Sequence, residues 1–142
     1  MRKTHTSHLP GHLDLETIIE QKAATVYFYG NFVVVEVNEG VTLSYRTGFS
    51  LLIKGLSILK RKPWIYISNR VNSYAVNPTD YKYLNKVPTL KGLVIVDRST
   101  VGKKNASLEA NFSDKPFMVV DTMEAAYQWG KALLEKNSSK NT

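Results

Sequence analysis

Apolar residues group along the chain in short β-prone runs that alternate with longer stretches of helical spacing. The first two runs are separated by Gly30-Asn31, a pair typical of a hairpin turn. A later run, Leu93 to Val96, is apolar throughout, as in strands buried on both faces of a parallel sheet. The pattern predicts five strands, at 24–29, 32–37, 64–68, 93–96 and 116–120. Residues 15–20 fit either a further edge strand or a helical turn.

A helix is predicted between the second and third strands. Ser44 is a candidate N-cap, and Pro63 stops the helix. Apolar residues recur there at intervals of three or four, which makes one stripe along the helix. The stripe consists of Tyr45, Phe49, Leu52, Leu56 and Leu59.

Two further helices separate the remaining strands. One begins at Asn77-Pro78, where asparagine caps the helix and proline takes the first helical position, and it ends before Pro88. In the other, apolar side chains at helical spacing define an inner face, on which Asn105 also falls. The apolar members of that face are Val101, Leu108 and Phe112.

A last helix follows the fifth strand. It opens with Asp121-x-x-Glu124, which resembles a capping box. Its predicted inner face consists of Ala126, Trp129, Gly130 and Leu133.

Strands that alternate with helices indicate an α/β fold. We predict a mixed, largely parallel five-stranded sheet with an N-terminal antiparallel hairpin and about four helices. Residues 1–12 are interpreted as a flexible N-terminal arm, 13–136 as a single α/β domain, and 137–142 as a polar C-terminal tail.

The composition narrows the function classes. A chain of 142 residues can build one domain with a real core. It contains no cysteine, which excludes disulfides, thiolate zinc sites, iron–sulfur clusters and cysteine nucleophiles. No apolar run approaches the roughly 20 residues that span a bilayer, and no signal peptide is recognisable. These features predict a cytoplasmic location.

The net charge of +7 could attract nucleic acid or an anionic membrane surface. The lysines are dispersed, however, and the only tight cluster, Lys60-Arg61-Lys62, falls at a predicted helix end, where cations complement the helix dipole. We therefore favour a solvated basic surface over a nucleic-acid site. His5, His8 and His12 lie in the predicted arm, where nothing would preorganise them, so no metal site is expected.

Catalytic motifs are missing from the sequence. The three histidines all lie in the predicted arm, so a triad with a core histidine is not available. There is no G-x-S-x-G, no P-loop and no G-x-G-x-x-G, and the carboxylates show no paired spacing typical of acid–base catalysis. We therefore expect a non-enzymatic protein without a cofactor.

A dense block of polar residues follows the third predicted strand. Ligands of open α/β sheets collect beyond the carboxyl ends of the strands, where residues 97–100 and 121–122 should also lie. Arg70 and Arg98 could bind a carboxylate or phosphate there, and exposed helix N-termini would add backbone donors. The candidate binding residues are Ser68, Asn69, Arg70, Asn72, Ser73, Tyr74 and Arg98.

Two other interpretations remain open for this block. Its asparagines are ordinary turn formers, and Arg70 could pair with Asp80 or Asp97 to hold the loop. Tyrosine is enriched at protein interfaces, so a docking surface also fits. The tyrosines concerned are Tyr66, Tyr74, Tyr81 and Tyr83.

The order of elements, together with PWIYISNRVNSYAVNPTDY, GLVIVDRS and EAAYQW, resembles the SpoIIAA-like branch of the STAS fold. This branch includes anti-sigma-factor antagonists and small uncharacterised bacterial proteins, and the resemblance covers residues 24–135. It implies a regulatory or protein-interaction module that docks through the loop after the central strand. The alternative is a small-anion or lipid-binding protein with its site at the carboxyl ends of the strands. A homodimer could form through an exposed edge of the hairpin.

Antagonists of this family carry a phosphorylatable serine in an Asp-Ser-Ser-Gly-type turn. This sequence departs from that pattern, because neither Ser68 nor Ser73 is flanked by the expected acid and glycine. Both serines are therefore candidate phosphorylation sites only, and a phospho-switch is a minor variant of the regulatory hypothesis.

Overall fold

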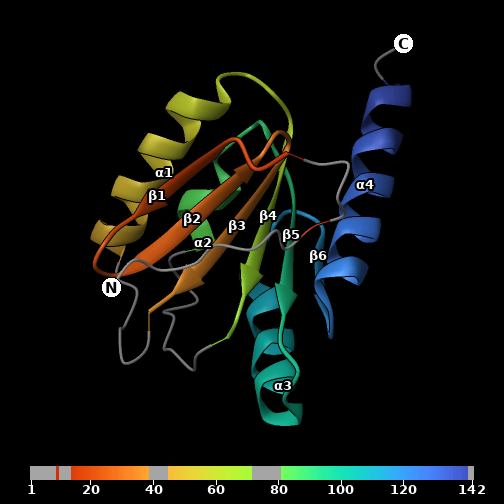
Figure 1. The fold of residues 1–142 in the computed structure, drawn as a ribbon. Coiled ribbons are helices and arrows are strands. Elements are labelled where there is room, and N and C mark those ends of the chain that lie inside the picture. The colour runs from red at the N-terminus through yellow and green to blue at the C-terminus, as the bar shows by residue number, and fades with distance from the viewer. Residues whose placement is uncertain (1–8, 10–13, 39–44, 72–80, 141–142) are drawn as a thin grey trace.

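The structure is a computed structural model that describes residues 9, 14–38, 45–71 and 81–140 (Figure 1). Residues 45–47, 49 and 137–140 are described by their backbone alone. The predicted N-caps Ser44 and Asn77 lie outside the described residues, as do the three histidines.

The described residues form one mixed sheet of six strands in the order β1-β2-β3-β4-β5-β6. The pairs β1–β2 and β2–β3 are antiparallel, whereas β3 to β6 run parallel to one another. The strands are β1 (Thr17–Glu20), β2 (Ala24–Tyr29), β3 (Phe32–Val37), β4 (Trp64–Asn69), β5 (Leu90–Val96) and β6 (Phe117–Val120).

The prediction of five strands was one short. The sixth is β1, in the segment that the sequence left undecided, and its residues Thr17 to Glu20 pair with Phe28 to Thr25 of β2. The β2–β3 hairpin was predicted correctly. Gly30 has a φ of 66° in its turn, a backbone conformation that glycine adopts without steric cost.

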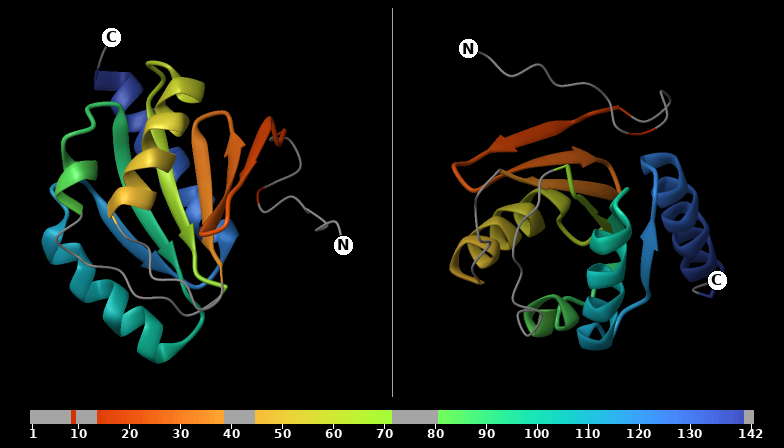
Figure 2. Two further views of the ribbon diagram at one scale, coloured as in Figure 1. Left: turned by 90° about the vertical axis from the view of Figure 1, so that its left-hand side faces the viewer. Right: turned by 90° about the horizontal axis from the view of Figure 1, so that it is seen from below.

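Four α-helices and one 3₁₀ turn connect and follow the strands in the described part of the chain. They are α1 (Tyr45–Leu59), α2 (Tyr81–Asn85), α3 (Thr100–Glu109), the turn Ala110–Phe112, and α4 (Met123–Lys140). Figure 2 shows α1, α2 and α3 on one face of the sheet and α4 on the other. The connections between parallel strands lead in turn from β3 to β4, from β4 to β5 and from β5 to β6, always toward the same edge of the sheet. Because such connections are nearly always right-handed, the helices in them lie on one face.

Two hydrophobic layers enclose the sheet. The layer on the α1 side includes Phe28, Leu59 and Trp64. The layer on the α4 side includes Tyr27, Ile65 and Ala126. Neighbouring residues on a strand therefore serve opposite layers, as the alternation of side chains along a strand requires.

Helix α4 packs on the sheet through the predicted face, where Gly130 is buried. A Cβ at Gly130 would lie 2.8 Å from a ring carbon of Phe32, so glycine permits the close approach. The predicted Asp121 capping box was wrong. Thr122 caps α4 instead, because its Oγ1 accepts a hydrogen bond from the N–H of Ala125 at 3.1 Å.

Helix α3 lies where the sequence predicted it, but its predicted inner face was wrong. Val101 and Leu108 are exposed, and α3 buries Ala106 and Glu109 instead. Glu109 is buried because it meets partners from two other elements, which the local pattern of α3 could not reveal.

The described residues reach into both predicted terminal segments. Leu9, in the predicted arm, is buried in the α4-side layer. At the other end α4 continues to Lys140, into the predicted tail. None of the helices within the described ranges is long and apolar enough to cross a membrane.

Candidate functional site

The polar block after the third predicted strand begins inside the sheet. The strand β4 extends to Asn69, and the side chains of Ser68 and Asn69 are buried. Phosphorylation of Ser68 would therefore require β4 to open, since only 1% of this residue is exposed. The candidates Asn72, Ser73 and Tyr74 lie outside the described residues.

Asn69 belongs to a buried polar cluster on the α4 side of the sheet. Its Nδ2 donates to Oε2 of Glu36 at 2.7 Å, and the hydroxyl of Tyr27 donates to Oε1 at 3.2 Å. Burial, followed by the charge of Glu36, raises the pKa of the Tyr27 hydroxyl above its usual range. The sequence reasoning missed Glu36, although an acid within the apolar run FVVVEV was a visible signal.

Arg70 forms a bidentate ion pair with Glu109. Its Nη1 and Nη2 donate to the two carboxylate oxygens at 2.7 and 2.6 Å, and both side chains are about one-tenth exposed. The hydroxyl of Tyr81 also donates to Glu109 Oε1, at 2.6 Å. Burial and the charge of Glu109 raise the pKa of Tyr81 well above its usual range.

This cluster joins three elements, since Arg70 follows β4, Tyr81 begins α2 and Glu109 ends α3. Arg70 thus ties the end of β4 to α2 and α3. Among the described residues, the ion-pair partner of Arg70 is Glu109 rather than Asp97, and Asp80 lies outside them. Nothing in the sequence around Glu109 indicates that it pairs with Arg70.

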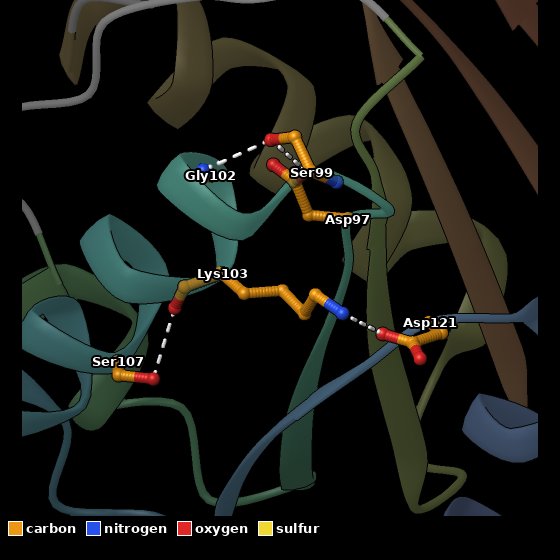
Figure 3. A network of polar contacts seen from close by, with 6 residues as sticks. All are labelled: Asp97, Ser99, Gly102, Lys103, Ser107 and Asp121. Atoms are coloured by element: carbon orange, nitrogen blue, oxygen red, sulfur yellow. Dashed lines mark hydrogen bonds and ion pairs between the residues drawn. The ribbon is translucent and has the colours of Figure 1, made fainter.

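A second network stands at the start of α3 (Figure 3). Oδ1 of Asp97 accepts hydrogen bonds from the N–H and the hydroxyl of Ser99, both at 2.9 Å. Ser99 Oγ in turn accepts from the N–H of Gly102 at 2.9 Å and so caps the helix. A Cβ at Gly102 would lie only 2.1 Å from Asp97 Oδ2, so glycine makes room for the carboxylate.

The rim of the sheet also holds an ion pair between α3 and the segment after β6. Lys103 binds the carboxylate of Asp121, as Figure 3 shows. Because β4, β5 and β6 are parallel, the predicted convergence of residues 97–100 and 121–122 on one edge is correct. Of the two candidate arginines, Arg98 is exposed, whereas Arg70 is bound to Glu109.

Large apolar side chains are exposed beside this rim. Val101, Leu108 and Phe112 are 71%, 60% and 44% exposed, and we call these three residues the α3 stripe. Val71, directly after Arg70, is 54% exposed. It lies near the start of α3, because the N–H of Arg70 donates to the carbonyl of Val96, just before Asp97.

Within the described ranges, no three histidine, aspartate or glutamate side chains gather closely enough to hold a metal ion. Comparison with family models, curated proteins and solved structures gave no match for this chain.

Proposed function

We propose that the chain is a non-enzymatic protein-interaction module of the SpoIIAA-like type. Its docking surface comprises the α3 stripe and the neighbouring Val71, at the start of the loop after β4. The observation that carries this proposal is the exposure of the stripe, whose three apolar side chains follow one another at helical spacing without packing on the core.

The polar groups beside the stripe favour a protein-docking surface over a catalytic site. Arg70 is bound to Glu109, Lys103 is bound to Asp121, and Asp97 and Ser99 are engaged at the start of α3. These side chains hold the rim in shape. A partner protein would then gain mainly from burying apolar surface, at roughly 25 cal/mol per Å².

The resemblance noted in the sequence points the same way. The structure has the order of elements on which the resemblance rests, a hairpin followed by alternating helices and strands. The implied docking loop begins at the end of β4, and its last described residue, Val71, is exposed next to α3. In this proposal, Ser73 remains the candidate for a regulatory phosphate.

A small-anion or lipid site at the carboxyl ends of the strands is the weaker alternative. The guanidinium of Arg70 already holds a carboxylate, and the N–H of Gly102 at the start of α3 donates to Ser99. Arg98 offers an exposed cation there, but a single exposed arginine gives little affinity.

The test is quantitative affinity capture from the source cells with three forms of the protein. The double variant Val101→Ser/Leu108→Ser should lose the captured partner that wild type retains. Ile53→Ser is the matched control, because Ile53 is 51% exposed on α1, away from the α3 stripe. All three should have the same melting temperature, since exposed substitutions usually change stability by less than about 0.5 kcal/mol.

Equal capture by all three forms would overturn the docking surface. Light scattering on purified wild type separates a different partner from a second copy of this chain. A dimer that the double variant abolishes would assign the α3 stripe to self-association.

A further inference from the structure

A cavity of about 330 Å³ opens at the end of the sheet at which the parallel strands begin. It lies at the start of β5 and just before β6, where the second half of α4 passes. In Figure 1 this is the end from which the arrows of β5 and β6 start. Nothing in the proposed docking function uses it.

Three lysines from separate parts of the chain line this cavity. Lys91 is the second residue of β5, Lys115 lies just before β6, and Lys136 lies on α4. Lys91 Nζ donates to the carbonyl of Pro88 at 3.0 Å, which holds this ammonium group at the cavity. Lys91 and Lys115 are partly buried, whereas Lys136 is exposed.

Positive charge exceeds negative charge among the residues that line the cavity. In the part of the chain that the structure describes, none of the three lysines has an ion-pair partner, in contrast to Arg70 and Lys103. Asp114 is the one carboxylate among the lining residues, against three ammonium groups. Burial, followed by the charge of Lys91, lowers the pKa of Lys115, and Asp114 only partly opposes this.

The remaining wall is apolar. Pro88, Pro116 and Leu133 of α4 line it, whereas Leu90, 1% exposed, lies beneath the surface. The volume is at the lower end of the range of about 300–1,000 Å³ that is typical of small-molecule sites. An inorganic anion would leave the apolar wall unused, whereas a short organic body would cover it.

We propose that this cavity binds a small organic anion with one phosphate or carboxylate group. The anionic group lies between Lys91, Lys115 and Lys136, and its apolar body packs against Pro116 and Leu133. Such a ligand could be a free small molecule or the exposed end of a lipid, and both present the same chemistry to the lysines.

The test is calorimetric titration of the full chain at low salt with four probes. These are hexyl phosphate, hexanoate, inorganic phosphate, and vesicles of phosphatidylglycerol in phosphatidylcholine. We expect hexyl phosphate or hexanoate to bind at least fivefold more tightly than inorganic phosphate. Backbone amide signals of Leu90, Lys91 and Leu133 should move in NMR spectra during the titration.

The variant Lys115→Gln should weaken this binding at least tenfold. Lys22→Gln is the matched control, because it removes the same charge from an exposed residue in the β1–β2 turn. Its affinity should remain that of wild type. Melting temperatures of both variants establish that the fold is intact.

Several results would overturn the proposal. These are no binding of either organic probe, equal affinity for inorganic phosphate, or equal weakening by Lys22→Gln. Binding of vesicles but not of hexyl phosphate or hexanoate would also contradict it, because it would indicate a surface effect of the net charge. If vesicles and an organic probe both bind, and Lys115→Gln loses both, the ligand is the exposed end of a lipid. The docking test is independent, since Val101 and Leu108 do not line the cavity.

Discussion

At the residue scale, the most constrained side chain of the candidate site is Arg70. Its partner, Glu109, lies 39 positions further along the chain. Burying two charges is costly in itself, so the pair is not an obvious source of net stability. Removing one partner, however, leaves the other charge buried and unpaired, and that is strongly destabilising.

The substitution Arg70→Ala should therefore lower the free energy of unfolding by about 3–5 kcal/mol. The measurement is urea denaturation followed by circular dichroism. Lys103→Ala is the comparison, because it breaks the Lys103–Asp121 pair, in which the side chains are 36% and 64% exposed. It should cost less than about 1 kcal/mol, and similar losses in both variants would contradict the importance of burial.

Tyr81 should make the protein sensitive to high pH. Its neutral hydroxyl donates to Glu109, and the folded state raises its pKa above the ordinary value of about 10. The folded state therefore keeps this proton after the unfolded state has lost it. The stability that it contributes is complete below about pH 10 and is lost as the pH rises further.

The variant Tyr81→Phe should show a shallower decline of stability above pH 10 than wild type. Tyr27 also has a raised pKa, so the double variant Tyr27→Phe/Tyr81→Phe should reduce the slope further. Unfolding free energies at pH 8 to 11 provide the measurement. An unchanged slope in both variants would show that neither hydroxyl is linked to folding in this range.

At the element scale, α1 ends in an unusual way. Lys60 has a φ of 58°, the left-handed conformation in which glycine is common after a helix, and its N–H donates to the carbonyl of Leu56 at 2.8 Å. The basic cluster at 60–62 thus serves partly as the helix terminus. A side chain at this position is strained.

Lys60→Gly should stabilise the protein by about 0.5–1 kcal/mol, because glycine relieves this strain. Lys62→Gly is the control, since Lys62 does not have a positive φ. It should be neutral or destabilising in thermal denaturation. A loss of stability in Lys60→Gly would mean that its side chain contributes more than the strain costs.

Two helical glycines should respond to alanine in opposite directions. A Cβ at Gly130 would lie 2.8 Å from Phe32 and 3.1 Å from Ile65, whereas one at Gly48 would meet nothing within 4 Å. We expect Gly130→Ala to lower the unfolding free energy by about 1–3 kcal/mol. Gly48→Ala should raise it by about 0.5–1 kcal/mol through helix propensity. Chemical denaturation measures both changes. If both variants change the unfolding free energy in the same direction, the close packing of α4 at Gly130 is contradicted.

At the scale of the whole molecule, one sheet serves both hydrophobic layers. Within the described residues β1 and β6 are its two edges, so the strand edge considered for a homodimer is β1 rather than the hairpin itself. The central strands β4 and β5 contribute side chains to both layers. The two layers should therefore unfold together.

Ile67→Ala in the α4-side layer and Leu93→Ala in the α1-side layer test whether the two layers unfold together. Each residue is fully buried, so each substitution should cost about 2–5 kcal/mol. Both should shift a single transition that fluorescence and circular dichroism report identically. Separate transitions in either variant would show that the layers are independent folding units.

The sequence by itself determined the order of elements and the α/β class. Alternation in the strands and helical spacing between them are local patterns, so they can be read without a structure. The hairpin at Gly30 and the inner face of α4 follow from the same local physics. Thr17–Glu20 was too short to assign until its pairing with β2 was known.

Only the tertiary structure decided the features that bear on function. Glu109 turns inward, and Val101 and Leu108 turn outward, because Arg70 and Tyr81 arrive from other elements to bind the carboxylate. The lysine cavity likewise gathers residues from 91 to 136. These arrangements depend on contacts between distant positions, and a one-dimensional pattern carries no information on which distant side chains meet.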